Sequence, residues 1–278
     1  MSITVRPGVL EDLPYLLEIE PKATPGLQYL NDVQEEFFNN EIGEMVVAEE
    51  DGVIIGFGRF STQFDGSGWL ECLRVDPAHQ KKGCGAQIWK RYVELCEKYN
   101  VPFVRMYTGL TNYASKVLGE RNGLHVAYQT QEVTLMKENI PAFEPVEGFE
   151  LADCHHCVAA AIEPYAEGFH NYFCTNRTFY TMGEDLYKGL VADNWVWKKG
   201  ENMVAIGARF QKDKALHIGL MGGDLDECMR FALQKFRESG VAKLAFMIPS
   251  EREDLHEIAA KYGFTIPTNH IIMLERAF

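Results

Sequence analysis

The stretch VDPAHQKKGCGAQIW, residues 75–89, decides how this sequence is read. Two lysines lead into Gly83 and Gly85, and an amphipathic helical pattern follows at once. Small residues let the backbone come close to a ligand, and successive amide groups can then point into one cavity. A helix that starts at such a loop adds its positive end, which favours a phosphate group. The stretch therefore predicts an anion-binding loop, and Lys81 and Lys82 would supply further positive charge.

Two common phosphate-binding motifs do not fit this loop. A Walker A loop places a lysine directly after its last glycine, whereas here the lysines precede the glycines. A dinucleotide-binding fingerprint needs glycine or alanine at its sixth place, where this chain has Ile88. The motif also follows a late strand of the region rather than its first one.

The segments around the loop predict alternating strands and helices. Asp51-Gly52 between two β-rich runs indicates a hairpin, and Asp76-Pro77 ends the strand before the loop. Apolar residues at helical spacing follow the loop, and Asn100 is placed to end that helix. The predicted strands cover 3–7, 44–50, 53–62, 66–77 and 101–107, the predicted helices 11–20, 30–43, 86–100 and 111–123, and the run 125–137 forms one bent strand or two strands.

The loop and this order of elements resemble the GNAT acetyltransferase superfamily. Its Q/R-x-x-G-x-G/A loop, which grips the pyrophosphate of acetyl-CoA, is similar to Gln80 through Ala86. The resemblance implies a strand before the loop that splays from its neighbour and holds the pantetheine arm. It also implies that Asn112 contacts the coenzyme arm. The residues implied to contact acetyl-CoA are Leu73, Arg74, Val75, Gln80, Lys81, Lys82, Gly83, Cys84, Gly85, Ala86, Asn112 and Ser115.

The second half of the chain repeats the order of the first. AIGARF at 205–210 parallels IGFGRF at 55–60, and the later segments match with a shift of 140 residues. A period this long indicates a duplicated domain. We predict an α/β fold with mixed sheets in two tandem GNAT-like domains, residues 1–138 and 148–278, joined by a linker over 139–147 that contains two prolines.

The second copy of the loop lacks the features that attract a phosphate. It reads Leu220-Met-Gly-Gly-Asp-Leu-Asp226, without the glutamine and both lysines. Asp224 and Asp226 would repel a pyrophosphate. We expect this copy to be degenerate and to cover the first domain, shape the acceptor site or form a homodimer.

Candidate catalytic residues come from the strand before the loop and from the region after it. The resemblance implies a carboxylate base on that strand, and Glu71 stands there, on a face that alternation would share with Trp69 and Val75. The family tyrosine that often protonates the leaving thiolate is replaced by Gly119. Tyr107 and Tyr113 are candidate substitutes, and an unassisted thiolate is itself a tolerable leaving group near neutral pH.

Composition limits the partners. The net charge of −13 does not suit a nucleic-acid binder, which carries a clustered basic footprint. No apolar run approaches the roughly 20 residues of a membrane span, and the first residues do not read as a secretion signal, so we expect a cytoplasmic protein. Between Lys22 and Arg59 the chain has acidic residues and no basic ones, which predicts either a solvated face or a rim that attracts a cationic substrate.

Seven cysteines at irregular spacing predict free thiols rather than disulfides in this setting. Cys154 and Cys157 have the spacing of a metal box, but no second pair completes a zinc site, and His170 and Cys174 are only the nearest candidates. We therefore expect Cys154 and Cys157 to be core or surface residues at the start of a helix, with no bound metal. Neither Cys72, expected on the strand face opposite Glu71, nor Cys84 is proposed as a nucleophile.

Taken together, the sequence predicts an acetyl-CoA-dependent N-acetyltransferase. Its acceptor would be a primary amine, most simply a small cationic molecule, which attacks the thioester directly in a ternary complex. A non-catalytic acyl-CoA sensor is the alternative, supported by Gly119 and opposed by Glu71. A two-domain enzyme that makes a thiol cofactor shares the tandem order, but its working copy would be the second one, which the loop contradicts.

Overall fold

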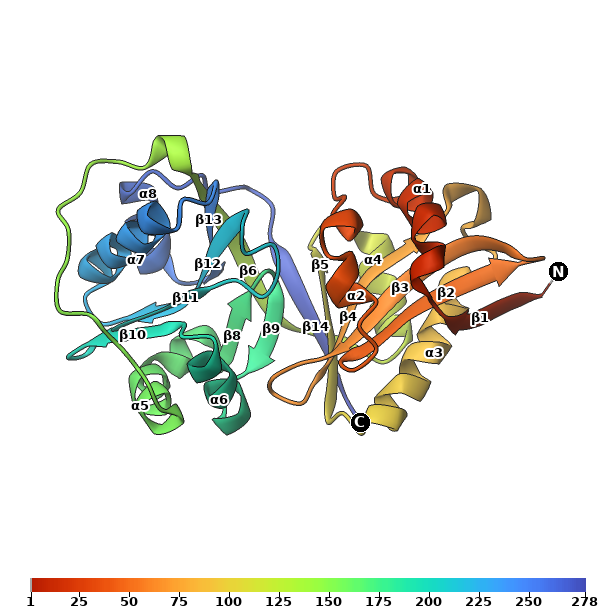
Figure 1. Cartoon of the computed structure of the whole chain (residues 1–278), viewed down its shortest axis with the longest axis horizontal. Coiled ribbons are helices and arrows are strands. Elements are labelled where there is room, and N and C mark those ends of the chain that lie inside the picture. The colour runs from red at the N-terminus through yellow and green to blue at the C-terminus, as the bar shows by residue number, and fades with distance from the viewer. Residues whose placement is uncertain (1) are drawn as a thin grey trace. The chain divides into compact units, whose positions relative to one another are not determined.

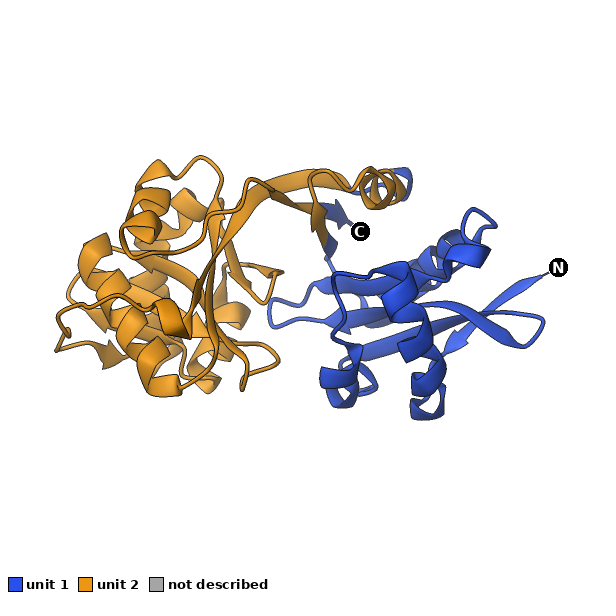
Figure 2. Ribbon diagram, turned by 90° about the horizontal axis from the view of Figure 1, so that it is seen from above, with its two compact units in different colours: residues 1–106, 121–124, 275–278 blue, residues 107–120, 125–274 orange. Residues whose placement is uncertain are grey.

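The computed structural model describes residues 2–278 and has the mixed α/β class that the sequence predicts. It contains two compact units (Figure 2). The first holds residues up to 106 together with 121–124 and 275–278, and the second holds 107–120 and 125–274. No helix in the described part of the chain is both long and apolar enough to cross a lipid bilayer.

The first unit is built on a mixed sheet (Figure 1). The strand order is β1 to β5, antiparallel except for the parallel pair β4–β5. Helix α3 packs against β1 to β4 and helix α1 against β3 and β4. Its elements are β1 (Ile3–Pro7), η1 (Leu10–Asp12), α1 (Leu13–Ala23), η2 (Leu30–Asp32), α2 (Gln34–Phe37), β2 (Gly43–Glu50), β3 (Val53–Thr62), β4 (Gly68–Val75), η3 (Pro77–His79), α3 (Cys84–Tyr99) and β5 (Phe103–Gly109). The last residues of β5 and nearly all of the following helix, α4 (Tyr113–Arg121), are counted with the second unit.

Two glycines of β3 let α3 approach the sheet closely. A side chain at Gly58 would place its Cβ 1.9 Å from the hydroxyl of Tyr92, and one at Gly56 would meet the sulfur of Cys84 at 2.7 Å. Only glycine leaves room for these two residues of α3. The IGFGRF motif at 55–60 is therefore a packing surface for the helix that follows the loop.

A β-bulge interrupts β4 beside Glu71. Phe57 pairs with Arg74 and Arg59 with Glu71, so two residues of β4 oppose one residue of β3. Within the bulge Cys72 has a φ of 60°, a left-handed backbone conformation that is uncommon for residues other than glycine. Strict alternation across the whole of β4 is therefore wrong.

The bulge also changes which face each residue of β4 occupies. Val75 opposes Gly56 and Glu71 opposes Arg59, three residues further along β3, so the two side chains lie on opposite faces. Cys72 is close enough to Tyr29 for a hydrogen bond. Burial raises the pKa of its thiol to about 12, so Cys72 stays protonated near neutral pH.

The segment 30–43 is not the single helix that its pattern predicted. A 3-10 turn spans Leu30–Asp32, and α2 lasts only from Gln34 to Phe37. The carboxylate of Glu20 accepts hydrogen bonds from the amides of Tyr29 and Leu30 at 3.1 and 3.2 Å, which fixes the entry to this turn. Tertiary hydrogen bonds here override local propensity.

The second unit is also built on a mixed sheet. Its strand order is β6-β13-β12-β11-β10-β7, and only β12 and β13 are parallel. A separate hairpin pairs β8 with β9. The elements are β6 (His125–Met136), η4 (Lys137–Asn139), β7 (Glu150–Leu151), α5 (His155–Ala166), η5 (Glu167–Phe169), β8 (Tyr172–Thr175), β9 (Thr178–Thr181), α6 (Glu184–Ala192), β10 (Val196–Lys199), β11 (Asn202–Gly207), β12 (Ala215–Gly222), α7 (Leu225–Ser239), β13 (Lys243–Pro249), α8 (Glu253–Lys261) and β14 (Ile271–Ala277).

The two halves of the chain exchange their last strands. Strand β6, from the first half, pairs with β13 of the second unit from Thr130 to Met136. Residues 275–278, from the end of the chain, belong to the first unit, where Glu275 forms an ion pair with the buried Arg105 and the amide of Phe278 bonds to Pro102. The compact units are thus assembled from both halves, whereas the predicted domains 1–138 and 148–278 follow the chain.

His217 of β12 gives the second unit a pH dependence. Its side chain is buried, and burial lowers the pKa of the imidazole to about 4. An exposed histidine in the unfolded chain titrates near 6.5, so between pH 6.5 and 4 the unfolded state takes up a proton that the folded state does not. The contribution of His217 to the free energy of unfolding is therefore fully present above pH 6.5, and about 3 kcal/mol of it is lost as the pH approaches 4.

We expect His217→Gln to lose much of this pH dependence. Urea unfolding at pH 7.5 and at pH 4.5 measures the change in both proteins, and an exposed histidine variant, His125→Gln, serves as the control. Equal loss of stability in all three proteins would show that other groups cause the acid sensitivity.

Candidate active site

The predicted loop lies between β4 and α3 in the first unit. The carboxylate of Asp76 accepts a hydrogen bond from the amide of Ala78 at 2.9 Å and starts the turn. Gly83 has a φ of 96° and is the N-cap of α3, but it supplies no side-chain cap. The first amides of a helix have no partner within it, so the start of α3 keeps donors for an external acceptor. The side chains of Lys81 and Lys82 beside it are exposed.

The loop also has room for a ligand at its glycine. A Cβ added at Gly83 would meet no atom of the protein within 4 Å. Cys84, by contrast, is turned inward against Gly56, and burial raises the pKa of its thiol to about 11. The loop therefore presents backbone amides and lysines rather than a reactive thiol, which is the chemistry of an anion site.

The corresponding helix start in the second unit is closed by its own side chain. The carboxylate of Asp224, the N-cap of α7, accepts hydrogen bonds from the amides of Asp226 and Glu227 at 3.0 and 3.1 Å. Asp226 itself contacts Lys261, Arg230 and Tyr262. The hydrogen bond from Lys261 lowers the pKa of the Asp226 carboxyl. Negative charge thus already occupies the place where an incoming phosphate would bind.

Strands β4 and β5 separate soon after they pair. In the first unit, parallel pairing is limited to Gly68 with Val104 and Trp69 with Arg105, although β4 continues to Val75. The backbone groups of Leu73 and Arg74 on that side of β4 are therefore not used by a ladder with β5. Such an opened strand pair is the feature that the resemblance implied for the pantetheine arm.

A buried hydrogen-bond chain leads away from Glu71. Ser61 donates to the Glu71 carboxylate at 3.1 Å, and Arg59 donates both to Ser61 at 3.1 Å and to the carbonyl of Asn39 at 2.8 Å. All three side chains of this chain are buried, Glu71 being 7% exposed. The candidate base is thus held in place by side chains of β3.

The hydrogen-bond chain ends at a cavity of about 620 Å³. Gly8, Leu10, Glu35, Phe38 and Asn39 are among the residues that line it. Glu35, in the acidic segment, is exposed, whereas Glu44 and Glu49 of the same segment form ion pairs with Arg91 and Arg6. Part of the acidic segment is therefore structural, and Glu35 is the carboxylate that faces an open cavity.

The sequence did not single out Ser61, Arg59 and Asn39. A signal for Arg59 existed, because a lone arginine within the apolar strand IGFGRF needs a buried partner. Ser61 and Asn39 had no comparable signal, since their partners come from other elements.

The remaining candidate residues belong to the second of the two compact units. Tyr107 on β5 stacks beneath the guanidinium of Arg177 at 5.7 Å, and Tyr113 at the start of α4 is 72% exposed. The side chain of Asn112 accepts a hydrogen bond from the amide of Ser115 at 3.3 Å and so caps α4. These four residues stay predictions as site residues, as do Glu71 and the loop residues.

The comparisons with known proteins agree with this geometry. Residues 13–123 match the model of the acetyltransferase (GNAT) family, and this part of the chain is a GNAT domain. No curated protein matches the sequence significantly.

Solved structures with the same fold cover nearly the whole chain. A GCN5-related N-acetyltransferase from Sphaerobacter thermophilus has a TM-score of 0.68 at 12% identity, covering 99% of this chain and 95% of that one. A tandem GNAT protein from the clavulanic acid biosynthesis pathway has a TM-score of 0.59 at 12% identity, covering 99% and 98%. The glucosamine N-acetyltransferase region of a fungal multi-domain β-N-acetylglucosaminidase has a TM-score of 0.69 at 10% identity, covering 99% and 38%. The tandem GNAT fold predicted from the sequence is confirmed.

Gly83 offers a direct test of the loop. We expect Gly83→Val to weaken coenzyme A binding at least about tenfold, because the new side chain would fill the space over the helix start. Gly52→Val is the matched control, since Gly52 is also left-handed, at a φ of 79°, and also has no atom within 4 Å of an added Cβ. Calorimetric titration measures the affinities, and equal weakening in both variants would contradict a role for the loop.

Proposed function

We propose that this protein transfers the acetyl group of acetyl-CoA to a primary amine of a small cationic molecule. The observation that carries the proposal is the start of α3, where a GNAT domain presents an uncapped helix end beside two exposed lysines. The residues fit the coenzyme: amides and lysines for its pyrophosphate, and the free edge of β4 for its pantetheine arm. Acetyl-CoA itself supplies the activated thioester.

In this mechanism Glu71 acts as the general base. A primary amine with a pKa near 10.4 is only about 0.04% neutral at pH 7, so proton removal before attack is a large part of the barrier. The Glu71 carboxylate, held by Ser61, accepts that proton directly or through a water. Gly119 leaves the usual acid position without a hydroxyl, so the thiolate departs unassisted or with help from Tyr107 or Tyr113.

The acceptor would bind in the cavity beside Asn39. Glu35 attracts a cationic amine there, and the hydrogen-bond chain through Arg59 and Ser61 connects the cavity wall to Glu71. The structurally similar fungal region is described as acting on glucosamine, an amino sugar, and amino sugars and diamines are therefore the first acceptors to test.

The second unit would take no coenzyme. Asp224 already accepts hydrogen bonds from the amides at the start of α7. At the bulge in β12, the residue that pairs with Ile206 of β11 is Ile218, which has no carboxylate to act as a base. We therefore assign it a supporting role, either in shaping the acceptor site or in a homodimer, in a cytoplasmic protein that needs no metal for this reaction.

The experiment combines binding with turnover. Calorimetric titration with acetyl-CoA is expected to give one site per chain. Isotope-labelled acetyl-CoA is then incubated with a panel of diamines and amino sugars, and mass spectrometry identifies labelled amides, with Gly83→Val as the control. Two sites per chain would contradict the assignment of the second unit. Clear binding without any product across amines and cell metabolites would favour the acyl-CoA sensor, for which Gly119 is the supporting observation.

A further inference from the structure

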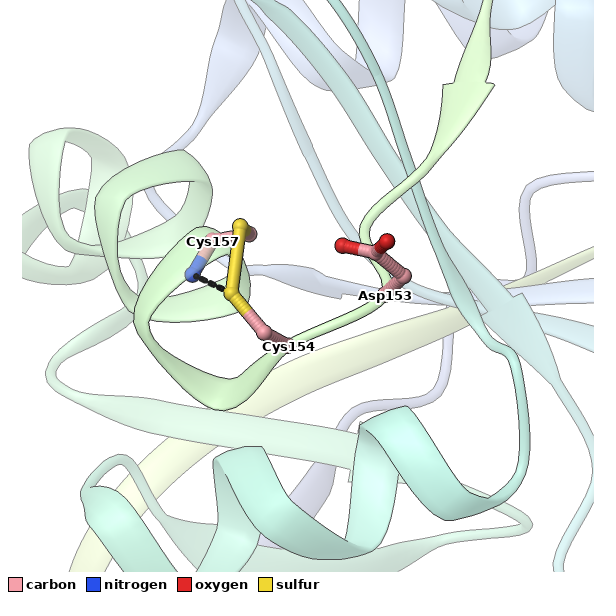
Figure 3. A group of neighbouring side chains, drawn as sticks. All are labelled: Asp153, Cys154 and Cys157. Atoms are coloured by element: carbon pink, nitrogen blue, oxygen red, sulfur yellow. Dashed lines mark hydrogen bonds between the residues drawn. A yellow bond between two sulfur atoms is a disulfide. The ribbon is translucent and has the colours of Figure 1, made fainter.

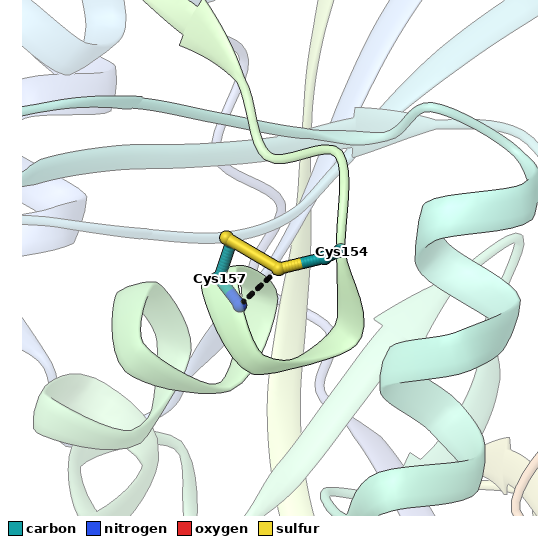
Figure 4. Close-up of a disulfide and its surroundings, with 2 residues drawn as sticks. All are labelled: Cys154 and Cys157. Atoms are coloured by element: carbon teal, nitrogen blue, oxygen red, sulfur yellow. Dashed lines mark hydrogen bonds between the residues drawn. A yellow bond between two sulfur atoms is a disulfide. The ribbon is translucent and has the colours of Figure 1, made fainter.

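Cys154 and Cys157 lie in the second unit at the start of α5, remote in sequence from the loop and Glu71. The structure joins them in a disulfide, with Cα atoms 5.1 Å apart (Figure 4). The expectation of free thiols is therefore wrong for this pair, although α5 does begin here, at His155. The other cysteines of the described chain are free and buried: Cys72, Cys84, Cys96, Cys174 and Cys228.

The position of the two cysteines favours a reactive disulfide over one that stabilises the fold. The two cysteines are three residues apart and share the first turn of one helix, so the bond ties no distant segments together. Cross-links that close such short loops remove little entropy from the unfolded chain. Both residues are also partly exposed, so a small reagent can reach them.

The local geometry makes the two sulfurs unequal. Cys154 is the N-cap of α5, and its sulfur accepts a hydrogen bond from the amide of Cys157 at 3.2 Å. A helix start with an amide directed at sulfur stabilises a thiolate. Cys157 lies inside the turn and receives no such bond from the helix start. In the reduced pair, Cys154 is thus the better nucleophile, and Cys157 stands beside it to complete a second step.

We propose that Cys154 and Cys157 form a redox-active pair that reacts with small disulfides by thiol–disulfide exchange. The thiolate of Cys154 attacks one sulfur of a disulfide R–S–S–R, forms a mixed disulfide and releases one R–S⁻. Cys157, after losing its proton to solvent, attacks the sulfur of Cys154 and releases the second R–S⁻. The pair loses two electrons and two protons, and the small disulfide becomes two thiols. The reverse sequence reduces the disulfide that the structure contains.

Asp153 and the two cysteines could together hold a metal ion once the pair is reduced, which is the competing interpretation of this site. One of the Asp153 carboxylate oxygens lies within 4.8 Å of both sulfurs, and Figure 3 shows the carboxylate on the side of the sulfurs. A disulfide and a metal held by thiolates exclude each other, because both use the same two sulfur atoms. Metal capture by the reduced protein is therefore an outcome that the experiment must be able to detect.

The test uses the full-length reduced protein and glutathione disulfide as the probe. Intact-mass spectrometry follows the wild type and the Cys154→Ser and Cys157→Ser variants after the reductant is removed. We expect Cys157→Ser to gain one glutathione on Cys154 at least about ten times faster than Cys154→Ser gains one on Cys157. The wild type should lose two hydrogens and accumulate no adduct. The double variant is the matched control and should stay unmodified, because its remaining cysteines are buried.

Three results would overturn the proposal. The two single variants could react at the same slow rate as the double variant, or the reduced wild type could fail to reform the bond. Alternatively, the reduced protein could hold one equivalent of added Zn²⁺ against a weak chelator and then resist glutathione disulfide. If a variant does not fold, as judged by circular dichroism, differential alkylation of Cys154 and Cys157 in the reduced wild type measures the same rate ratio.

Discussion

Replacing Glu71 by glutamine is expected to lower kcat for acetyl transfer by about 10²- to 10⁴-fold, the usual contribution of a general base. Glutamine keeps the shape of the side chain and its acceptor for Ser61, so the strand and the loop should stay intact. Affinity for acetyl-CoA should change less than about twofold. Raising the pH should partly restore the rate, because more of the amine is then neutral without help.

The matched control is another buried carboxylate of the same sheet. Glu44 on β2 is 6% exposed and pairs with Arg91 at 2.7 Å, but it belongs to no hydrogen-bond chain with Glu71 in the described contacts. Glu44→Gln should lower stability and leave kcat nearly unchanged. Steady-state kinetics and calorimetric titration on both variants provide the measurement. If Glu71→Gln retains the wild-type kcat and pH profile, the base lies elsewhere.

The second large effect concerns stability and lies at the end of the chain. Arg105 on β5 is 1% exposed and bonds to the carboxylates of Asp65 and Glu275. Glu275→Ala removes one of these two charges from a buried guanidinium, which should lower the free energy of unfolding by about 3 kcal/mol. The first unit should then melt several degrees earlier than in the wild type.

Glu253→Ala serves as the control for this prediction, because Glu253 is an exposed glutamate at the start of α8. Differential scanning calorimetry compares the two variants at pH 7. A melting temperature of Glu275→Ala equal to that of Glu253→Ala would show that Arg105 does not depend on the last strand.

The sequence predicted those features that depend on local pattern. The loop before α3 and the hairpin at Asp51-Gly52 have signals within a few residues, and both stand where expected. The aspartates of the second loop were expected to repel phosphate, and Asp224 does place its charge over the amides at the start of α7. In each case one short stretch contains both the signal and the structure.

Features that depend on distant partners were not predictable in this way. Alternation predicted that Glu71 and Val75 lie on one face of β4, but the bulge puts them on opposite faces. The bulge depends on the pairing with β3, so the sequence of β4 alone does not show it. The pattern of 30–43 favoured a helix, but the buried Glu20 holds the chain in a turn. The disulfide of Cys154 and Cys157 was missed because composition argued against disulfides in general, whereas the helix start brings these two sulfurs together.

The exchange of last strands has a consequence during synthesis. A ribosome releases the chain from its N-terminus, yet residues 275–278 of the first unit leave the ribosome long after residues 1–106 of the same unit. Until then the nascent chain exposes strand edges that, in the finished protein, are covered. A fragment ending near residue 138 would keep β6 without β13 and Arg105 without Glu275, and two such fragments could pair their open edges with each other. We therefore expect the N-terminal fragment expressed alone to form aggregates or swapped dimers, and a fragment meant to keep the native first unit should carry residues 275–278 as a fused segment.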